Sequence, residues 1–366
     1  MASGADHISD LPEGVFHHIL SLLPAHDAVR TCVLAHRWRD LWRSAPAVRI
    51  VGCRDWPGGI EAFGRFVDGL LRHRRGGAPL ESCGFDLDLE VDPSDLPAVE
   101  QQGNSCIRRA LRRKVRELRF DVSVQITPRL LFTLSDRPLA SEHLTRLELA
   151  GVQGNAGVLD FSWCPALEEL KMVECSVGSL AMHSPSVKHL SIKYCFFYSN
   201  YRTGLSFPNL VSFKFITNCG RAPLLESMPM LETAKVRFDH FYDDRCRNGR
   251  TDDDCGDAFC YGCYYYYGPD DYDCVFLEGL TEATHLYLSA FPELVCLHLL
   301  SPQLSYYLQF YYFSCSKCKR SNYYTAIMTN TCLDCISIVP FQSPCFNLMP
   351  PVVCSRPPRC IIIENV

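Results

Sequence analysis

The residues whose types and spacing could do chemistry lie near the carboxyl end, where cysteines occur in C-x-x-C pairs. One pair is Cys315 and Cys318, and a second is Cys332 and Cys335. Tetrahedral zinc takes four thiolates, and two pairs at this separation could supply them. Glycine turns, which usually surround zinc-binding cysteines, are missing from this stretch, and C-x-x-C pairs arise by chance among 21 cysteines. We therefore expect no bound metal, and a zinc module that binds nucleic acid stays as an alternative.

Motifs of catalysis are missing from the rest of the chain. The sequence has no G-x-S-x-G, Walker loop, dinucleotide fingerprint or H-E-x-x-H. No cysteine has the recognisable surroundings of a nucleophile. Four of the histidines fall in an N-terminal segment of helical pattern, which explains them without catalysis: His17, His18, His26 and His36. The sequence predicts a protein that is not an enzyme and that holds no cofactor.

Composition bounds the class of protein. The chain has 366 residues, of which 47% are hydrophobic and 21% charged, as in ordinary folded soluble proteins. A formal net charge of −5 argues against nucleic acid or anionic lipid as the main partner. No apolar window is long enough to span a membrane, and the amino terminus is acidic and unlike a signal peptide. With 21 cysteines, the protein is expected in a reducing compartment, the nucleus or the cytoplasm or both.

The segment 6–46 has the pattern of short amphipathic helices. Apolar residues recur at helical spacing up to Pro24, which ends the first helix. A second, short helix follows Asp27, and a third carries Trp38 and Trp42 on one face. Three short helices cannot bury so much apolar surface among themselves, so the segment needs a partner surface. That surface belongs either to another protein or to the rest of this chain.

The same segment resembles the F-box, in the form common among plant F-box proteins with leucine-rich repeats. The resemblance rests on the run ISDLPEGVFHHILSLLPAHDAVRTCVLAHRWRDLW, from which Gly14 and the pair Ala35-His36 are small departures. It implies docking on a Skp-type adaptor, which joins the chain to a cullin and its RING partner. The residues expected to dock, or to pack the helices that shape the docking surface, are Leu11, Pro12, Ile19, Leu23, Val29, Val33, Trp38 and Trp42.

A second pattern, apolar-x-x-apolar-x-apolar, recurs from residue 115 onward. Its period of 20 to 29 residues is typical of leucine-rich repeats, in which each repeat contributes one short strand. Cys175 and Cys195 follow two of these strands and are expected as small buried residues. An ordinary α/β domain with coincidental spacing is the alternative. The pattern occurs at Val115/Leu118/Phe120, Leu144/Leu147/Leu149, Leu167/Leu170/Met172, Val187/Leu190/Ile192, Leu210/Phe213/Phe215 and, weakly, Leu231/Ala234/Val236, with Ala283/Leu286/Leu288 as a further candidate.

We therefore expect an α+β or α/β repeat fold, with a three-helix F-box, a leucine-rich-repeat solenoid and an irregular tail rich in Cys and Tyr. The expected domains are the F-box at 6–46, a linker that leads into the solenoid at 47–105, divergent repeats at 106–300 and the tail at 301–366. The family usually continues into an FBD-type domain, and no convincing match to one follows Phe291. The tail is expected to be disordered or the product of a mispredicted final exon.

The function that the resemblance implies is that of a substrate receptor in a plant SCF-type cullin–RING E3 ubiquitin ligase, without catalysis of its own. A target protein, which the sequence does not name, would bind the solvent-facing residues of the repeat strands. A repeat scaffold with a vestigial F-box is the alternative. No membrane or nucleic-acid partner is expected. The expected target contacts are Arg146, Glu148, Glu169, Lys171, Lys188, His189, Ser191, Lys193 and Lys214.

Overall fold

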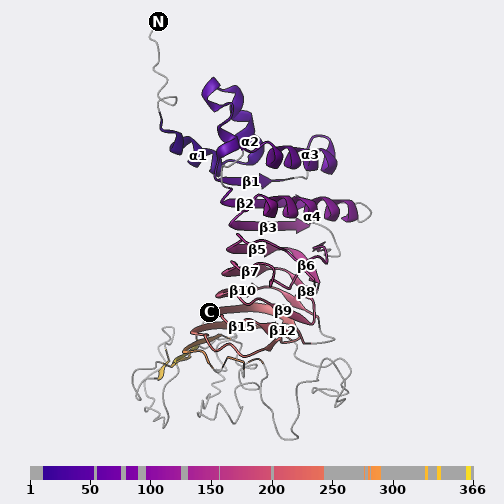
Figure 1. The fold of residues 1–366 in the computed structure, drawn as a ribbon. Helices are drawn as coiled ribbons and strands as arrows, with labels where there is room; N and C mark the ends of the chain where they lie inside the picture. Colours follow the sequence, from indigo (N-terminus) through magenta and orange to yellow (C-terminus); the bar gives the residue numbers. More distant parts are fainter. Residues whose placement is uncertain are drawn as a thin grey trace, which may run out of the picture. The chain divides into compact units, whose positions relative to one another are not determined.

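The computed structural model describes residues 11–52, 56–75, 80–89, 96–124, 131–155, 157–198, 202–242, 276, 279–280 and 282–289, with three further short strands nearer the carboxyl end (Figure 1). The chain forms two compact units, Met1–Cys175 and Ser176–Val366, each described here by itself. This division falls inside the predicted repeats, and the predicted domain limits stay a prediction. None of the described helices is both long and apolar enough to cross a membrane.

The first unit begins with short helices. Helix α1 spans Glu13–Leu22 and α2 spans Ala25–Arg30, and a proline precedes each of them. Proline is suited to a helix start because the first N–H groups of a helix have no partner within it. A 3-10 turn, η1 (Thr31–Val33), continues α2. The third predicted helix is instead a pair of 3-10 turns, η2 (His36–Trp38) and η3 (Leu41–Ser44), because the backbone leaves the helical conformation between them.

The main strands of the first unit are parallel and in continuous register. β1 (Ala47–Val51), β2 (Ser82–Leu89), β3 (Glu117–Val124), β5 (Arg146–Ala150) and β7 (Glu169–Val173) pair in that order. Helices α3 (Gly59–Arg72) and α4 (Leu96–Arg112) connect the first three strands and lie side by side (Figure 1). β4 (Phe132–Thr133) and β6 (Val152–Asn155) form a separate parallel pair. The unit is a mainly parallel α/β body.

The same turn precedes each of several strands. The carbonyl of Arg116 accepts hydrogen bonds from the N–H groups of Thr145 (2.8 Å) and Arg146 (3.0 Å). The carbonyl of Thr145 then accepts from Glu168 (2.9 Å) and Glu169 (3.0 Å). Because each turn is bonded to the next one along the sheet, the period predicted from the apolar residues is also a period of backbone hydrogen bonds. This confirms the repeat character of the region.

The periodic structure starts earlier in the chain than the apolar pattern indicates. The carbonyl of Pro46, before β1, accepts from Glu81 (2.8 Å) and Ser82 (3.2 Å). One strand later, the carbonyl of Glu81 accepts in the same way from Arg116 (3.0 Å) and Glu117 (2.8 Å). Segment 47–105, predicted as a linker, holds β1, α3, β2 and the first half of α4. The 20–29-residue period does not reveal these strand-and-helix repeats, because whole helices rather than short loops separate their strands.

The second unit contains three groups of strands. β10 (His189–Lys193), β13 (Ser212–Gly220), β15 (Thr233–Tyr242), β16 (His285–Ser289) and β19 (Cys360–Ile363) pair in parallel and in that order. β8 (Ser176–Gly178) pairs with β11 (Phe196–Phe197), which pairs with β13. β12 (Gly204–Ser206) lies between β9 (Ala181–His183) and β14 (Leu224–Leu225), and β17 (Ala326–Met328) pairs antiparallel with β18 (Ile336–Ile338). The strands β17, β18 and β19 fall within the predicted tail at 301–366.

The predicted repeat residues form the core of both units. Every described side chain of the seven apolar triplets is less than 9% exposed, from Val115 to Leu286, whereas the side chain of Leu288 lies outside the described residues. Cys175 and Cys195 are 1% and 0% exposed, as predicted. Their thiols donate to strand carbonyls, with Cys175 Sγ 3.4 Å from the oxygen of Leu149. The apolar pattern therefore predicts the inward face of the strands correctly.

Candidate protein-binding surfaces

A small core holds the N-terminal helices together. Its buried residues are Phe16, Leu20, Ala28, Trp38 and Ala45. The rings of Phe16 and Trp38 meet edge to face with their centroids 4.6 Å apart, a favourable aromatic geometry. On Phe16 also lies the guanidinium of Arg37, 4.6 Å from the ring centroid, and this guanidinium donates to the carbonyl of Leu11 (2.8 Å). Trp38 is therefore a core residue that holds the N-terminal helices in place.

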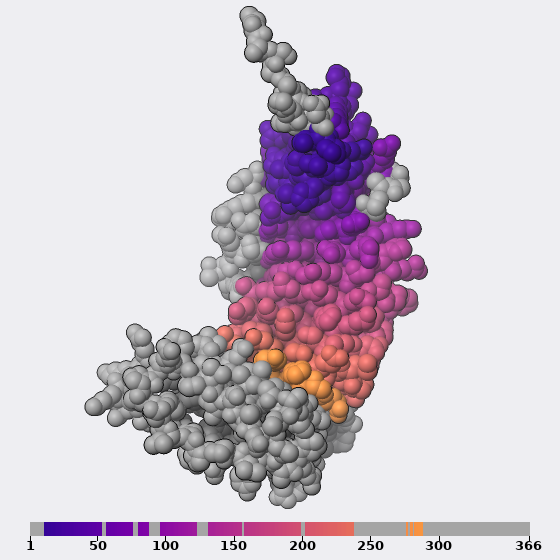
Figure 2. Space-filling view, turned by 90° about the vertical axis from the view of Figure 1, so that its left-hand side faces the viewer, coloured from indigo at the N-terminus to yellow at the C-terminus, as the bar shows by residue number. Residues whose placement is uncertain are grey.

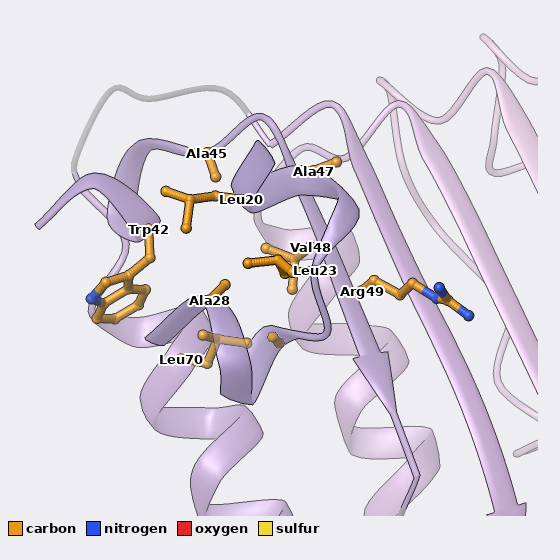
Figure 3. A pocket seen from close by; sticks show the side chains of 10 residues that line it. Leu20, Leu23, Ala28, Trp42, Ala45, Ala47, Val48, Arg49 and Leu70 are labelled. Carbon is orange, nitrogen blue, oxygen red and sulfur yellow. The ribbon is translucent and has the colours of Figure 1, made fainter. Parts of the chain in front are cut away.

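The helical segment is also fastened to the sheet of its own unit. Where α1 and α2 meet β1 and α3, a small apolar cavity is lined by residues that include Leu20, Leu23, Val48 and Leu70 (Figure 3). The backbone of Pro24 bridges to that of Arg49 in β1. From beyond α3, Arg74, which is 6% exposed, donates a hydrogen bond to the carbonyl of Ala45. One side of the segment is thus covered by the rest of its own chain, which was one of the two partner surfaces expected from the sequence.

Another side of the segment leaves large apolar side chains in solvent. Val15 is 40% exposed and Leu22 is 64% exposed, and with half-buried Ile19 they lie at positions i, i+4 and i+7 of α1. This spacing places them on one face of the helix, away from Phe16 and Leu20. In and just after η1, Val33 is 82% exposed and Leu34 is 69% exposed. Exposed apolar side chains gathered on one side make this side of the segment a candidate protein-binding surface.

The structure separates the eight predicted adaptor contacts by burial. Trp38 is buried in the small core, and Leu11, Leu23 and Trp42 are half-buried against it. Ile19 and Val29 are half-buried, and Pro12 and Val33 are exposed. Whether these residues bind an adaptor stays a prediction. Sequence reasoning missed the exposed Val15, Leu22 and Leu34, although the i, i+4, i+7 spacing in α1 could have revealed the first two.

In the first unit, the predicted target contacts are tied up in ion pairs across the strands. Arg146 and Glu169 lie opposite each other on β5 and β7, with Nη2 and Oε1 3.3 Å apart. Glu148 is only 14% exposed and accepts from Lys171 Nζ at 2.6 Å. Arg119 Nε, one strand back, lies 3.9 Å from the same carboxylate. Positive and negative charges alternate here, so this part of the face is largely neutralised by itself.

In the second unit, the predicted target contacts lie on β10 and β13, except Lys188, which directly precedes β10. Lys188, His189 and Lys214 are exposed, and Ser191 and Lys193 are half-buried. The alternation in β13 buries Phe213 and Phe215 on either side of Lys214. Those that lie within β10 and β13 share one face because the strands pair in register, with Ser191 directly opposite Lys214. The role of this face in binding a target stays a prediction.

Comparison with known proteins decides the nature of the N-terminal segment. The family model described as "F-box domain" matches residues 8–47, which include α1, α2 and the three 3-10 turns. The chain carries an F-box. This F-box domain has its own small core, an inner side on β1 and an outer side with exposed apolar residues.

Curated relatives are F-box proteins of plants. A rice protein named MEIOTIC F-BOX protein MOF (Oryza sativa subsp. japonica) is 32% identical over 202 residues, which are 51% of this chain and 40% of that protein. An F-box/LRR-repeat protein of Arabidopsis thaliana is 30% identical over 259 residues, 59% of this chain and 63% of that protein. A putative F-box/FBD/LRR-repeat protein of the same plant is 28% identical over 228 residues, 56% of this chain and 49% of that protein.

These alignments span less than two thirds of the length of each of these relatives. They support the predicted resemblance to plant F-box proteins with leucine-rich repeats. No solved structure matches the chain.

Seven described cysteines of this chain are thiols rather than disulfides, and several of them are deeply buried. Burial raises the pKa of the Cys83 thiol to about 12 and those of Cys106 and Cys164 to about 11. A thiol with so high a pKa is a poor nucleophile and a poor metal ligand at neutral pH. Within the described residues no group of three or more His, Cys, Asp or Glu side chains could hold a metal ion. The four tail cysteines weighed for zinc, Cys315, Cys318, Cys332 and Cys335, lie outside those residues.

Proposed function

We propose that this F-box protein is a substrate-receptor subunit of an SCF-type cullin–RING ubiquitin ligase. The match of residues 8–47 to the F-box carries the proposal, because F-box domains generally bind Skp-type adaptors. Through the adaptor, a cullin and its RING partner would join the assembly. The protein itself does no chemistry: it raises the concentration of a bound target near the ubiquitin-conjugating enzyme. We place this function in the nucleus, the cytoplasm or both.

The adaptor would bind the outer side of the F-box. The apolar face of α1, formed by Val15, Ile19 and Leu22, supplies one contact area, and Val33 and Leu34 supply another. An adaptor that covers Val15, Leu22, Val33 and Leu34, which are 40% to 82% exposed, would gain about 25 cal/mol of binding free energy for each Å² of apolar surface removed from water. The buried aromatic pair of Phe16 and Trp38 keeps the helices in the geometry that presents these side chains.

The strands of both units would present the target-binding residues. Their parallel register and their 20–29-residue period support repeats of the leucine-rich class, as in the F-box/LRR relatives. We propose that they belong to a leucine-rich-repeat solenoid, whose outward strand positions contact a target protein. Such surfaces change partners with a few exposed residues, so the fold alone does not identify the target.

Co-purification of the full chain with a Skp-type adaptor tests the proposal. The double variant Leu22→Arg/Val33→Arg places two charges on the outer side of the F-box and should abolish adaptor binding. The matched control is Trp163→Arg, because Trp163 is 62% exposed in the same unit and lies outside the F-box. The control should bind as the wild type does. Failure of the folded wild-type chain to bind any Skp-type adaptor would refute the proposal.

A second experiment distinguishes the receptor from the alternative, a repeat scaffold with a vestigial F-box. Wild-type protein is assembled with adaptor, cullin and RING protein, and ubiquitin transfer to proteins that it captures is followed by gel shift. Transfer that is lost in Leu22→Arg/Val33→Arg supports the receptor function. Adaptor binding without transfer to any captured protein would favour the scaffold.

A further inference from the structure

The outward face of β1, β2 and β3 has a glycine at its centre. Gly84 of β2 pairs with Arg49 of β1 on one side and with Arg119 of β3 on the other. Its neighbours in β2, Cys83 and Phe85, are buried, so position 84 belongs to the outward face of the sheet. In Figure 2, the segment of the chain that holds these three strands is coloured from indigo to purple.

The described residues leave open space above Gly84. A Cβ added there would meet none of their atoms within 4 Å. Pairing continues without a register shift on both sides of Gly84, and its φ lies outside the left-handed region, so neither a bulge nor a turn requires glycine. Glycine weakens the interior of a strand, and in a regular strand it often marks a place where a ligand or another chain approaches the backbone closely. Position 84 is therefore a candidate contact site.

Two arginine side chains flank this open space. Those of Arg49 and Arg119 are both 54% exposed, and each is held by a carboxylate. Nη2 of Arg49 donates to Oδ2 of Asp86 (3.2 Å), and Nη2 of Arg119 donates to Oδ2 of Asp121 (2.7 Å). Such bonds lie in the plane of the guanidinium, whose flat face can still stack on an aromatic ring. We call the open space over Gly84, with the two arginines beside it, the Gly84 site.

The dimensions of the Gly84 site match an aromatic ring. Neighbouring strands lie about 4.8 Å apart, so a ring centred over Gly84 would have one arginine about 4.8 Å away on each side. A cation attracts the face of a ring within roughly 6 Å of its centroid. Asp86, whose side chain is 46% exposed, is the next outward residue of β2, about 6.6 Å farther along the strand. An indole that lies along β2 can therefore donate its N–H to Asp86.

The charges around the Gly84 site favour a neutral ligand. Each of the two flanking arginines already pairs with a carboxylate. The hydrogen bond from Arg119 to Asp121, together with the charges of Glu148 and Asp86, raises the pKa of the Arg119 guanidinium. A carboxylate from a partner would come close to Asp86 and Asp121 and would be repelled by them. An aromatic ring instead gains from both cations without bringing a charge.

We infer that the Gly84 site binds a tryptophan side chain of the target protein, with the indole stacked between Arg49 and Arg119. Asp86 accepts the hydrogen bond of the indole N–H. This inference rests on the proposed function for the role of the strands in target capture. It names a chemical feature of the target, because tryptophan combines the strongest attraction to cations with an N–H donor and is enriched among the residues that dominate binding energy. The site lies outside the target contacts that the sequence predicted.

Fluorine NMR on the full chain tests the inference. The probe is N-acetyl-5-fluorotryptophan amide, whose single resonance shifts and broadens on binding. Gly84→Val fills the Gly84 site and should weaken binding of the probe at least about tenfold. Arg119→Gln keeps the space but removes one cation, and it should weaken binding several-fold. Circular dichroism confirms that Gly84→Val is folded, as expected for a residue of high strand propensity in open space.

The matched control is Ser212→Val, which places the same side chain at an outward position of β13 in the second unit. It should bind the probe within about twofold of wild type. Equal binding by wild type and Gly84→Val would overturn the inference, since the probe would then bind elsewhere. Displacement of the probe by N-acetylglutamate amide at a lower concentration than by N-acetyltryptophan amide would also overturn it, because an acidic side chain would then be the better ligand.

Adaptor co-purification separates this inference from the proposed function. Gly84→Val should still bind a Skp-type adaptor, since position 84 lies outside residues 8–47 that match the F-box. A wild-type chain that binds the adaptor but not the probe would refute the inference alone. Probe binding that is lost in Gly84→Val, by a chain that binds no adaptor, would refute the proposed function alone.

Discussion

Removing the indole of Trp38 should unfold the F-box without unfolding the rest of its unit. Trp38 is 7% exposed, and a tryptophan buries roughly 150–250 Å² in such a position. At about 25 cal/mol for each Å², Trp38→Ala forfeits about 4–6 kcal/mol of free energy of unfolding. The core that it leaves has only Phe16, Leu20, Ala28 and Ala45 as buried members, which is too little to keep short helices folded.

Hydrogen–deuterium exchange of the full chain, read by mass spectrometry, measures this effect region by region. Amides of α1 in Trp38→Ala should exchange about a thousandfold faster than in wild type, which corresponds to about 4 kcal/mol. Amides of β5 and β7 should keep their protection, because their own core does not include Trp38. Val33→Ala is the control, since Val33 is 82% exposed and its loss should change stability by less than about 0.5 kcal/mol. Equal protection of α1 in Trp38→Ala and Val33→Ala would refute the reasoning.

Three further predictions concern the body of the first unit. Gly151→Ala should unfold it or cost several kcal/mol, because Gly151 has φ 68° and a Cβ there would lie 1.8 Å from the carbonyl oxygen of Val122. Gly69→Ala, where the added Cβ would meet open space in α3, should instead raise the free energy of unfolding from urea titration by about 0.5–1 kcal/mol. Equal changes in the two variants would contradict this pair of predictions. The pKa of Cys83, about 12 when folded against 9.0 for an unperturbed thiol, predicts that stability is fully present below pH 9. Above pH 9 the unfolded chain releases this proton first, so the free energy of unfolding should fall by about 1.4 kcal/mol for each pH unit up to 12. Urea titrations at pH 8 and pH 10 check this, and a Cys83→Ala variant with an unchanged pH slope would contradict it. Glu148→Ala should cost about 1–2 kcal/mol in urea unfolding, because Lys171 loses the carboxylate that accepts its hydrogen bond, whereas Arg119 keeps its bond to Asp121. High salt should reduce that cost, and a cost that does not change with salt would exclude the ion pairs as its cause.

The repeats could be predicted from the sequence because burial of one strand face leaves a local mark. Leu147 and Leu149, or Leu170 and Met172, alternate with polar residues within five positions, and such alternation is visible without knowing the fold. The two strand-and-helix repeats that begin before residue 106, β1 with α3 and β2 with α4, were not predicted by the same reasoning. Helices α3 and α4 lengthen the spacing between their strands, so the period changes although the turn at Pro46 is bonded like the turn at Arg116.

Sequence by itself indicated an F-box and a repeat of short strands, because both depend on apolar residues at regular spacing, which the chain displays without knowledge of the fold. It also named the polar positions of the strands. Only the tertiary structure decided what these positions can do. Glu148 pairs with Lys171 and Arg119 from strands 20 or more residues away, whereas the register places Lys214 opposite Lys235. Which charge a side chain faces depends on the register of parallel strands, and register is set by the buried face and the turns, which a list of charged residues does not contain.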